Sequence, residues 1–297
     1  MSTLLSLLEK GHPSFVNPMD IYRHIVQLLP ESFSSEEKRA LARILCEDLW
    51  NIRPTDALLG RYNWDDNKEQ QLNTAISRLA DGLPVQYVTG TSLFCGRRFT
   101  VNRNVLIPRP ETEDLVDIAE KALVSLPTDA RICDACTGSG CIAITLALDH
   151  PNCQVEAFDI SPEALKTAAA NAHALSADIS FSQCNLLEQA SLPRGPWHLI
   201  VSNPPYVMQK EKATMQTQVK DHEPSLALFV EDSHPLIFYE ALARWAANCL
   251  VQEGVITCEI NALLSEETAN CFALQGFHDI EIMSDRYGQP RFITCKR

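Results

Sequence analysis

The stretch Asp134-Ala135-Cys136-Thr137-Gly138-Ser139-Gly140 decides the fold expected for this chain. It ends an apolar strand predicted over residues 131–135 and opens a helix that contains residues 141–148. Glycines at such a turn let a ligand approach the backbone closely, and the helix N-terminus offers free N–H groups. The stretch therefore predicts a βαβ unit with a ligand at its loop.

Strands and helices alternate from this stretch to the end of the chain. Ser161 is placed to cap the next helix, with Pro162 at its first position. Such alternation indicates an α/β fold, in which helical crossovers join a largely parallel sheet. Six further strands, which complete an expected seven-stranded sheet, are predicted at 154–158, 179–183, 198–202, 254–260, 278–283 and 291–296, with late helices at 236–250 and 264–274.

Residues 1–84 predict a small helical-bundle domain without strands. Asn17-Pro18 fits an N-cap followed by proline at the first helical position. Ser34 and Glu37 fit a capping box, and Asp81-Gly82 ends a further helix. Nothing in this domain suggests catalysis, so docking of a substrate or a purely structural role is expected of it.

Residues 85–110 change in character and predict a β-hairpin linker. Glycines and an asparagine punctuate short β-rich pieces at 86–89, 92–95, 98–101 and 105–107. A helix over 111–126, with acids in its first turn, then opens the third predicted part, residues 111–297.

Composition indicates a soluble globular protein, because 45% of the 297 residues are hydrophobic and 21% are charged. No apolar run approaches the roughly 20 residues that span a bilayer. Met1–Lys10 lacks a basic region before its apolar residues, so no signal peptide is predicted. The eleven cysteines are scattered, and several lie in apolar patterns, so a reduced, cytoplasmic chain is expected rather than a disulfide framework.

The net charge of -13 argues against broad binding to a nucleic-acid backbone, which needs a basic face. A monomer without membrane or direct nucleic-acid contact is expected. One local basic cluster stands out, and it is either a solvated hairpin face or a contact for an RNA-like or acidic partner. It consists of Arg97, Arg98, Arg103 and Arg109.

A second informative stretch is Val201-Ser202-Asn203-Pro204-Pro205-Tyr206, which follows the buried strand of residues 198–201. Its two prolines fix φ and lack amide donors, so the loop is expected to be stiff. It presents the Asn203 amide, carbonyls without an easy local donor, and the Tyr206 ring. Such a loop suits a planar group that carries an NH2, although an ordinary strand-ending loop is the alternative.

The glycine loop and Asp159 together predict a nucleoside cofactor. Asp159 follows the second strand about twenty residues after the loop, where a carboxylate can accept both hydroxyls of a ribose. A dinucleotide fingerprint would need a third glycine, whereas Cys141-Ile142-Ala143 follows Gly140. The acidic side chain of Asp134 suits a cofactor with an ammonium tail, which favours S-adenosylmethionine.

With both loops taken together, residues 111–297 resemble a Rossmann-like class I S-adenosylmethionine-dependent methyltransferase. The whole chain resembles the HemK-type protein-(glutamine-N5) methyltransferases, which modify peptide-chain release factors. The resemblance covers nearly all of the chain, and its most specific segment is Leu106-Ile107-Pro108-Arg109-Pro110-Glu111-Thr112-Glu113. It also includes Pro84-Val85-Gln86-Tyr87-Val88-Thr89-Gly90 and Glu223-Pro224-Ser225-Leu226-Ala227-Leu228.

The resemblance implies methyl transfer from S-adenosylmethionine to N5 of a glutamine in the Gly-Gly-Gln motif of release factors, with S-adenosylhomocysteine as product. The Asn203 oxygen and the Pro204 carbonyl would accept the N–H groups of the target amide, and Tyr206 would pack against it. Pro204 and Pro205 would keep the loop rigid, so little ordering entropy is lost at binding.

The resemblance also implies where the cofactor lies. The loop of residues 136–140 would contact its methionine part, Asp159 the ribose, and Asn185 with Leu186 the adenine. No metal site is expected. The full set of expected cofactor-binding residues is Asp134, Cys136, Thr137, Gly138, Ser139, Gly140, Asp159, Asn185, Leu186 and Asn203.

Three positions depart from the family pattern. Cys136 replaces a glycine, and its Cβ disfavours a positive φ. Asn185 stands where many relatives carry aspartate, which changes the donor and acceptor balance at the adenine edge. Residues 231–234 (Glu-Asp-Ser-His) replace a glycine-bearing turn.

Other interpretations are weaker. Cys133-Asp134-Ala135-Cys136 reads C-x-x-C, but a redox motif normally opens a helix and Cys133 lies in a strand. The nearest alternative activity is glutamine methylation of a ribosomal protein. The next is an amino-directed adenine or guanine methyltransferase, which shares the Asn-Pro-Pro-Tyr loop but should carry a basic target-recognition surface. An S-adenosylmethionine-binding regulator would be expected to have an altered 203–206 loop.

Overall fold

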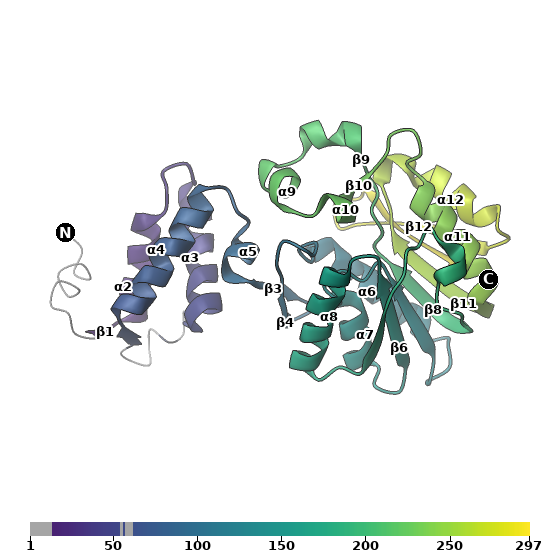
Figure 1. The fold of residues 1–297 in the computed structure, drawn as a ribbon, viewed down its shortest axis with the longest axis horizontal. Helices are drawn as coiled ribbons and strands as arrows, with labels where there is room; N and C mark the ends of the chain where they lie inside the picture. Colours follow the sequence, from purple (N-terminus) through teal and green to yellow (C-terminus); the bar gives the residue numbers. More distant parts are fainter. Residues whose placement is uncertain (1–13, 54–55, 57–61) are drawn as a thin grey trace. The chain divides into compact units, whose positions relative to one another are not determined.

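The computed structural model describes residues 14–53, 56 and 62–297 (Figure 1). The chain divides into two compact units, Met1–Thr91 and Ser92–Arg297. Met1–Lys10, for which no signal peptide is predicted, lies outside the described residues. The division into residues 1–84, 85–110 and 111–297 stays a prediction.

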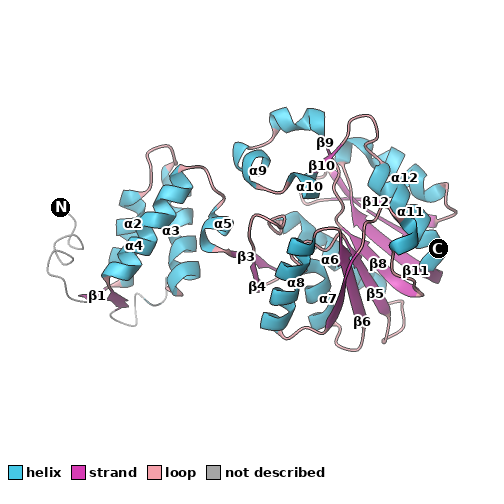
Figure 2. Ribbon diagram, viewed as in Figure 1, coloured by secondary structure: helices cyan, strands magenta, loops and turns pink. Residues whose placement is uncertain are grey.

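The described part of the N-terminal unit is mainly helical (Figure 2), and its long helices are α2 (Pro18–Leu28), α3 (Ser35–Trp50) and α4 (Asp66–Ala80). As predicted, Asn17 caps the first, because its side chain accepts from Met19 N at 2.8 Å. Ser34 and Glu37 form the expected capping box of the second. Apolar side chains of all three helices pack into one buried cluster.

Two predictions for the N-terminal part were wrong. Residues 1–84 are not free of strands, because β1 (Ser14–Val16) pairs antiparallel with β2 (Tyr62–Trp64). Strands of three residues are too short for an alternating pattern to reveal. Residues 86–89 belong to a short helix, α5 (Val85–Thr89), because Pro84 starts it and Gly90, at φ 74°, ends it in the left-handed conformation.

The expected hairpin is present as β3 (Thr91–Phe94) and β4 (Arg97–Thr100). The β-rich piece expected at 105–107 is not a strand. Its backbone is bound by a side chain instead, since Ile107 N donates to Glu223 Oε2 at 3.1 Å.

The C-terminal unit contains the predicted seven-stranded sheet, in the order β12-β13-β11-β8-β5-β6-β7. The five strands from β11 to β7 are parallel, and β13 is antiparallel to both its neighbours. The bounds agree with the predictions to within a few residues. They are β5 (Arg131–Ala135), β6 (Gln154–Asp159), β7 (Ile179–Gln183), β8 (Trp197–Ser202), β11 (Leu250–Glu259), β12 (His278–Ser284) and β13 (Pro290–Lys296).

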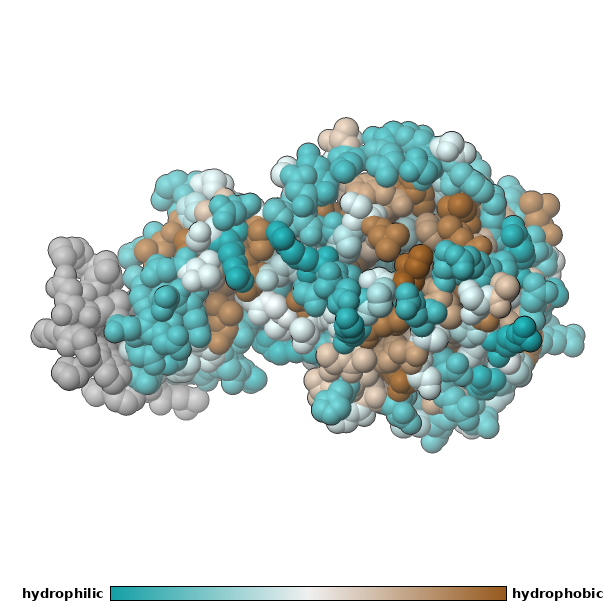
Figure 3. All heavy atoms as spheres, in the orientation of Figure 1, coloured by the Kyte–Doolittle hydropathy of each residue, from teal (hydrophilic) through white to brown (hydrophobic). Residues whose placement is uncertain are grey.

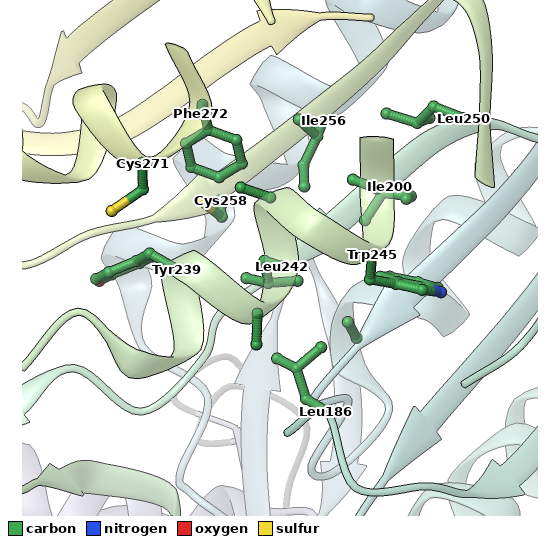
Figure 4. Close-up of a cluster of buried hydrophobic side chains, with 14 of the residues drawn as sticks. Leu186, Ile200, Tyr239, Leu242, Trp245, Leu250, Ile256, Cys258, Cys271 and Phe272 are labelled. Carbon is green, nitrogen blue, oxygen red and sulfur yellow. The ribbon is translucent and has the colours of Figure 1, made fainter. Parts of the chain in front are cut away.

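Helices cover both faces of this sheet. Successive strand residues point to opposite faces, so Ile132 packs in the cluster with α6 (Pro110–Leu123) and α7 (Cys141–Asp149), whereas Cys133 packs in the other. Figure 4 shows this second cluster, where α11 (Ile237–Cys249) and α12 (Ser265–Ala273) contribute. The helix α8 (Pro162–Leu175) has Ser161 as its cap, as predicted.

Short elements that the sequence did not predict lie between β8 and α11. The strands β9 and β10 pair in parallel, so they join the residues after the Asn-Pro-Pro-Tyr loop to those before α11. The elements are β9 (Val207–Met208), η3 (Gln209–Thr214), α9 (Thr217–His222), α10 (Ser225–Leu228) and β10 (Phe229–Val230); two further 3-10 turns are η2 (Gln189–Ser191) and η4 (Ala262–Leu264).

Among the described residues, no helix combines the length and hydropathy that a bilayer span requires. Figure 3 shows hydrophobic side chains, in brown, among hydrophilic ones, in teal, on the visible face of the C-terminal unit. Apolar atoms contribute a large share of any folded surface, so this mixture alone marks no binding face.

Candidate active site

A cavity of about 340 Å³ lies in the C-terminal unit. Its walls include the residues that follow β5, β6, β7 and β8, so it lies at the carboxyl ends of the parallel strands. The chain runs from β5 toward β6 on one side and continues with β8 on the other. A reversal of strand order of this kind is where open α/β sheets bind ligands.

The glycine loop forms one wall of the cavity. Cys136, Gly138 and Gly140 all have positive φ, at 63°, 55° and 81°. A Cβ at Gly138 would meet nothing within 4 Å, which leaves room for a ligand close to the backbone. A Cβ at Gly140 would lie 3.1 Å from Ala168 Cβ, so this glycine serves close helix packing and does not line the cavity. Cys136 adopts the conformation that its Cβ disfavours.

Asp159, at the end of β6, is held in place by backbone donors and lines the cavity. Its Oδ2 accepts from Gly138 N at 2.9 Å and its Oδ1 from Ser161 N at 2.9 Å. Burial raises the pKa of this carboxyl, and the backbone hydrogen bonds oppose that shift. Each oxygen keeps a free lone pair, so the carboxylate can still accept two hydroxyls.

Asp134 lies directly behind the loop and not in the cavity wall. It is wholly buried, and its Oδ2 accepts from Thr137 Oγ1 at 2.6 Å and from Ala143 N at 3.3 Å. Its Oδ1 has no partner among the described residues. Burial raises the pKa of Asp134 to about 7. An unpartnered buried oxygen is costly, and a cationic group beyond the loop would offset that cost.

Asn185 and Leu186 both line the cavity, as the adenine-border prediction requires. The Asn185 side chain is already engaged, since Oδ1 accepts from Leu187 N at 3.0 Å and Nδ2 donates to Glu188 Oε1 at 3.0 Å. Its amide therefore shapes the loop after β7. Leu186 is almost fully buried and supplies an apolar surface.

The Asn-Pro-Pro-Tyr loop follows β8, and only Asn203 and Pro205 of its four residues line the cavity. Asn203 Nδ2 donates to Thr112 Oγ1 at 3.3 Å. Tyr206 donates its hydroxyl to Glu259 Oε1 at 2.7 Å, and its ring packs against the core. The structure therefore does not bring Pro204 or Tyr206 to the cavity wall, where the sequence-based interpretation placed the Tyr206 ring.

Two acids near the cavity were not predicted as site residues. Glu259 is wholly buried at the end of β11 and accepts from Thr112 Oγ1 at 2.8 Å as well as from Tyr206. Glu223 accepts from Ile107 N at 3.1 Å and from Arg109 Nη2 at 2.5 Å. An acid directly after the largely apolar run of residues 255–258 was the signal available for Glu259.

Two of the four arginines in the basic cluster form ion pairs with acids. Arg97 forms an ion pair with Asp149, and Arg109 forms one with Glu223. Arg103 lines the cavity.

The state of the cysteines bears on the C-x-x-C interpretation. All eleven cysteines are free, and burial raises the pKa of Cys133 and Cys136 well above the usual value, which opposes a redox role.

The segment of residues 231–234, which lacks the family's glycine, still forms a turn, with His234 N donating to Glu231 O at 3.0 Å.

The cavity therefore combines a carboxylate for paired hydroxyls, an apolar wall, and a buried acid behind a glycine loop. These features fit a nucleoside that carries a cationic tail. Asn203, which follows β8, also lines the cavity. A cavity at the carboxyl ends of a seven-stranded α/β sheet, together with the family match that follows, indicates an enzyme of the methyltransferase class. Residues 112–226 match the family model described as Methyltransferase small domain, and residues 20–90 match the one described as PrmC N-terminal domain.

Curated relatives narrow this class. A release factor glutamine methyltransferase from Bacteroides thetaiotaomicron is 37% identical over 93% of this chain and 99% of its own length. One from Koribacter versatilis is 47% identical over 78% of this chain and 81% of its own length. A solved protein-(glutamine-N5) methyltransferase (release factor-specific) from Alicyclobacillus acidocaldarius is 31% identical, covering 67% of this chain and 99% of that one, with a TM-score of 0.42. The chain belongs to the release factor glutamine methyltransferase family.

Proposed function

We propose that this protein transfers a methyl group from S-adenosylmethionine to the side-chain amide nitrogen of a glutamine in peptide-chain release factors. The proposed target is the Gly-Gly-Gln motif, and S-adenosylhomocysteine is the second product. Membership of the family supports the reaction, and the Asn203 amide at the wall of the cavity carries the proposal. Release factors act in the cytoplasm, so we expect the enzyme to be cytoplasmic.

The cofactor would be held by four groups of residues. Asp159 would accept the ribose hydroxyls, and Leu186 with Asn185 would border the adenine. The loop from Cys136 to Gly140 would face the methionine part, where Gly138 leaves open space. The partnerless Oδ1 of Asp134 would stabilise the ammonium group through the loop. When bound, S-adenosylmethionine supplies an electrophilic methyl group.

The protein's task is to orient a poor nucleophile, because the lone pair of an amide nitrogen is delocalised. Asn203 lines the cavity, and its Oδ1 would accept one N–H of the target carboxamide. The Pro204 carbonyl, expected from the sequence to accept the other, does not line the cavity and is not part of this proposal. The nitrogen then lies in line with the methyl group, and orientation of this kind supplies up to roughly 7–11 kcal/mol. Bound S-adenosylmethionine would supply the methyl group and leave as S-adenosylhomocysteine, and the displaced proton would pass from the amide nitrogen to water.

The test is direct. Purified protein, labelled S-adenosylmethionine and release factor should give one labelled glutamine, located by mass spectrometry of the Gly-Gly-Gln peptide. Ribosomal protein and nucleic acid serve as the competing acceptors. Labelling of either in place of the release factor would replace the proposal with the corresponding alternative.

Asn203→Ala should lower kcat by about 10² or more, because one acceptor aimed at the reacting group is lost. Binding of S-adenosylhomocysteine, measured by calorimetry, should be nearly unchanged. An equal loss of turnover and cofactor binding would show that Asn203 serves the cofactor and not the acceptor amide.

A further inference from the structure

The amide of Asn203 has a defined orientation, and its cause lies outside the 203–206 loop. Asn203 Nδ2 donates to Thr112 Oγ1 at 3.3 Å, and among the described residues none donates to Asn203 Oδ1. A hydroxyl can donate or accept, so this one bond alone does not decide which end of the amide faces Thr112.

Glu259 decides it. Thr112 Oγ1 lies 2.8 Å from Glu259 Oε2, and both side chains are buried. Burial raises the pKa of this carboxyl, whereas the hydrogen bonds from Tyr206 and Thr112 and the charge of Arg291 favour its ionised form. Glu259 accepts at both oxygens, at Oε1 from the Tyr206 hydroxyl and at Oε2 from the Thr112 hydroxyl, so the single proton of the Thr112 hydroxyl is donated to Glu259. The Thr112 oxygen then offers only lone pairs to Asn203, which must turn its NH2 toward it. The oxygen of the Asn203 amide is left for a ligand.

The sheet register explains why Glu259 is in this position. β11 pairs in parallel with β8, and Cys258 is level with Ser202. Glu259 is therefore one residue further along, level with the start of the Asn-Pro-Pro-Tyr loop. The other oxygen of the carboxylate accepts from Tyr206 at 2.7 Å. The buried Glu259 carboxylate thus contacts Tyr206 directly and Asn203 through Thr112, at the two ends of the loop.

We propose that Glu259 and Thr112 are positioning residues that set Asn203 as a hydrogen-bond acceptor, so that the site selects a target that donates an N–H group. The selection of an amide over a group that can only accept follows from the direction of this hydrogen-bond chain. The expected effect on turnover rests on the proposed function, whereas the orientation of the Asn203 amide does not.

The first experiment therefore measures orientation without turnover. In protein labelled with 15N at asparagine, the Asn203 Nδ2 signals are identified by their loss in Asn203→Asp. Thr112→Val should speed exchange of these protons with solvent, and Thr112→Ser, which keeps the hydroxyl, should restore slow exchange. Combining Thr112→Val with Glu259→Gln should give less than the sum of the two single effects, because the part of the Glu259 effect that acts through Thr112 is already lost.

The kinetic arm uses the same variants with release factor as substrate. Thr112→Val should lower kcat by about 10- to 100-fold, as misorientation at a reacting group does, while S-adenosylhomocysteine affinity stays unchanged. Glu281→Gln, at an exposed position on β12, is the matched control and should behave as the native protein.

Unchanged Asn203 exchange in Thr112→Val, or full additivity in the double variant, would overturn the proposal whatever the substrate. A native protein that shows the exchange pattern but does not label release factor would instead refute the proposed function.

Discussion

Glu223 joins two segments of the cavity wall, and the strength of that connection can be worked out. The segments are residues 103–109 and 224–227, and members of both line the cavity. The Glu223 side chain is 1% exposed and that of Arg109 31% exposed. In Glu223→Gln the single remaining carbonyl oxygen can serve Ile107 N or Arg109, while the new NH2 faces a donor.

A hydrogen bond to a charged group contributes about 1.5–3 kcal/mol, and partial exposure of Arg109 screens the ion pair. Glu223→Gln should therefore ease local opening by about 2 kcal/mol, which corresponds to roughly 30-fold faster hydrogen exchange. Mass spectrometry of peptides that span residues 103–110 measures this change. Glu281→Gln again serves as the control.

Exchange that speeds up by less than about threefold would correspond to under about 0.7 kcal/mol and would refute the reasoning. A matching increase in peptides of β5 and β6 would also count against it. That pattern would mean global destabilisation of the unit and not release of one wall segment.

Two further predictions concern the glycine loop and the acid behind it. Because the Asp134 pKa is raised to about 7 by burial, binding of a cationic tail must expel a proton below that pH. S-adenosylhomocysteine affinity should then fall by up to about tenfold per pH unit below 7, and Asp134→Asn should remove this dependence. If calorimetry shows the same change of affinity with pH in the native protein and in Asp134→Asn, the prediction is contradicted. Gly140→Ala should destabilise the unit by more than about 1 kcal/mol, because the new Cβ would meet Ile144 Cδ1 at 3.0 Å. Gly138→Ala also places a Cβ at positive φ, but its open surroundings should make it less destabilising than Gly140→Ala, and its main effect should be weaker cofactor binding. Greater destabilisation by Gly138→Ala in thermal unfolding, or unchanged cofactor affinity in calorimetry, would contradict this.

The sheet was predictable because its signals are local. Helix caps at Asn17, Ser34 and Ser161 are formed by residues within three positions of one another, and buried parallel strands read as continuous apolar runs. The methyltransferase class was also predictable from residues near strand ends. The β1–β2 pair could not be predicted in this way, because each strand has too few residues to show an alternating apolar pattern.

The site was predicted only in part, because its remaining contacts are not local. That the Tyr206 hydroxyl points to Glu259 depends on the register of β11 against β8. Nothing near Tyr206 in the sequence shows that register. The same holds for Arg109 and Glu223, which are 114 positions apart, although both lie in segments that the family resemblance singled out.

The long sequence separation of these contacts has a consequence for the order of folding. The bond from Ile107 to Glu223 closes a loop of 116 positions, and the bond from Thr112 to Glu259 closes one of 147. During synthesis the glycine loop, with its local turns, can form long before either bond. A nascent chain that has not yet reached Glu259 would therefore hold an unoriented Asn203. The ability to distinguish acceptors is acquired late, after the part that holds the methyl donor has taken shape.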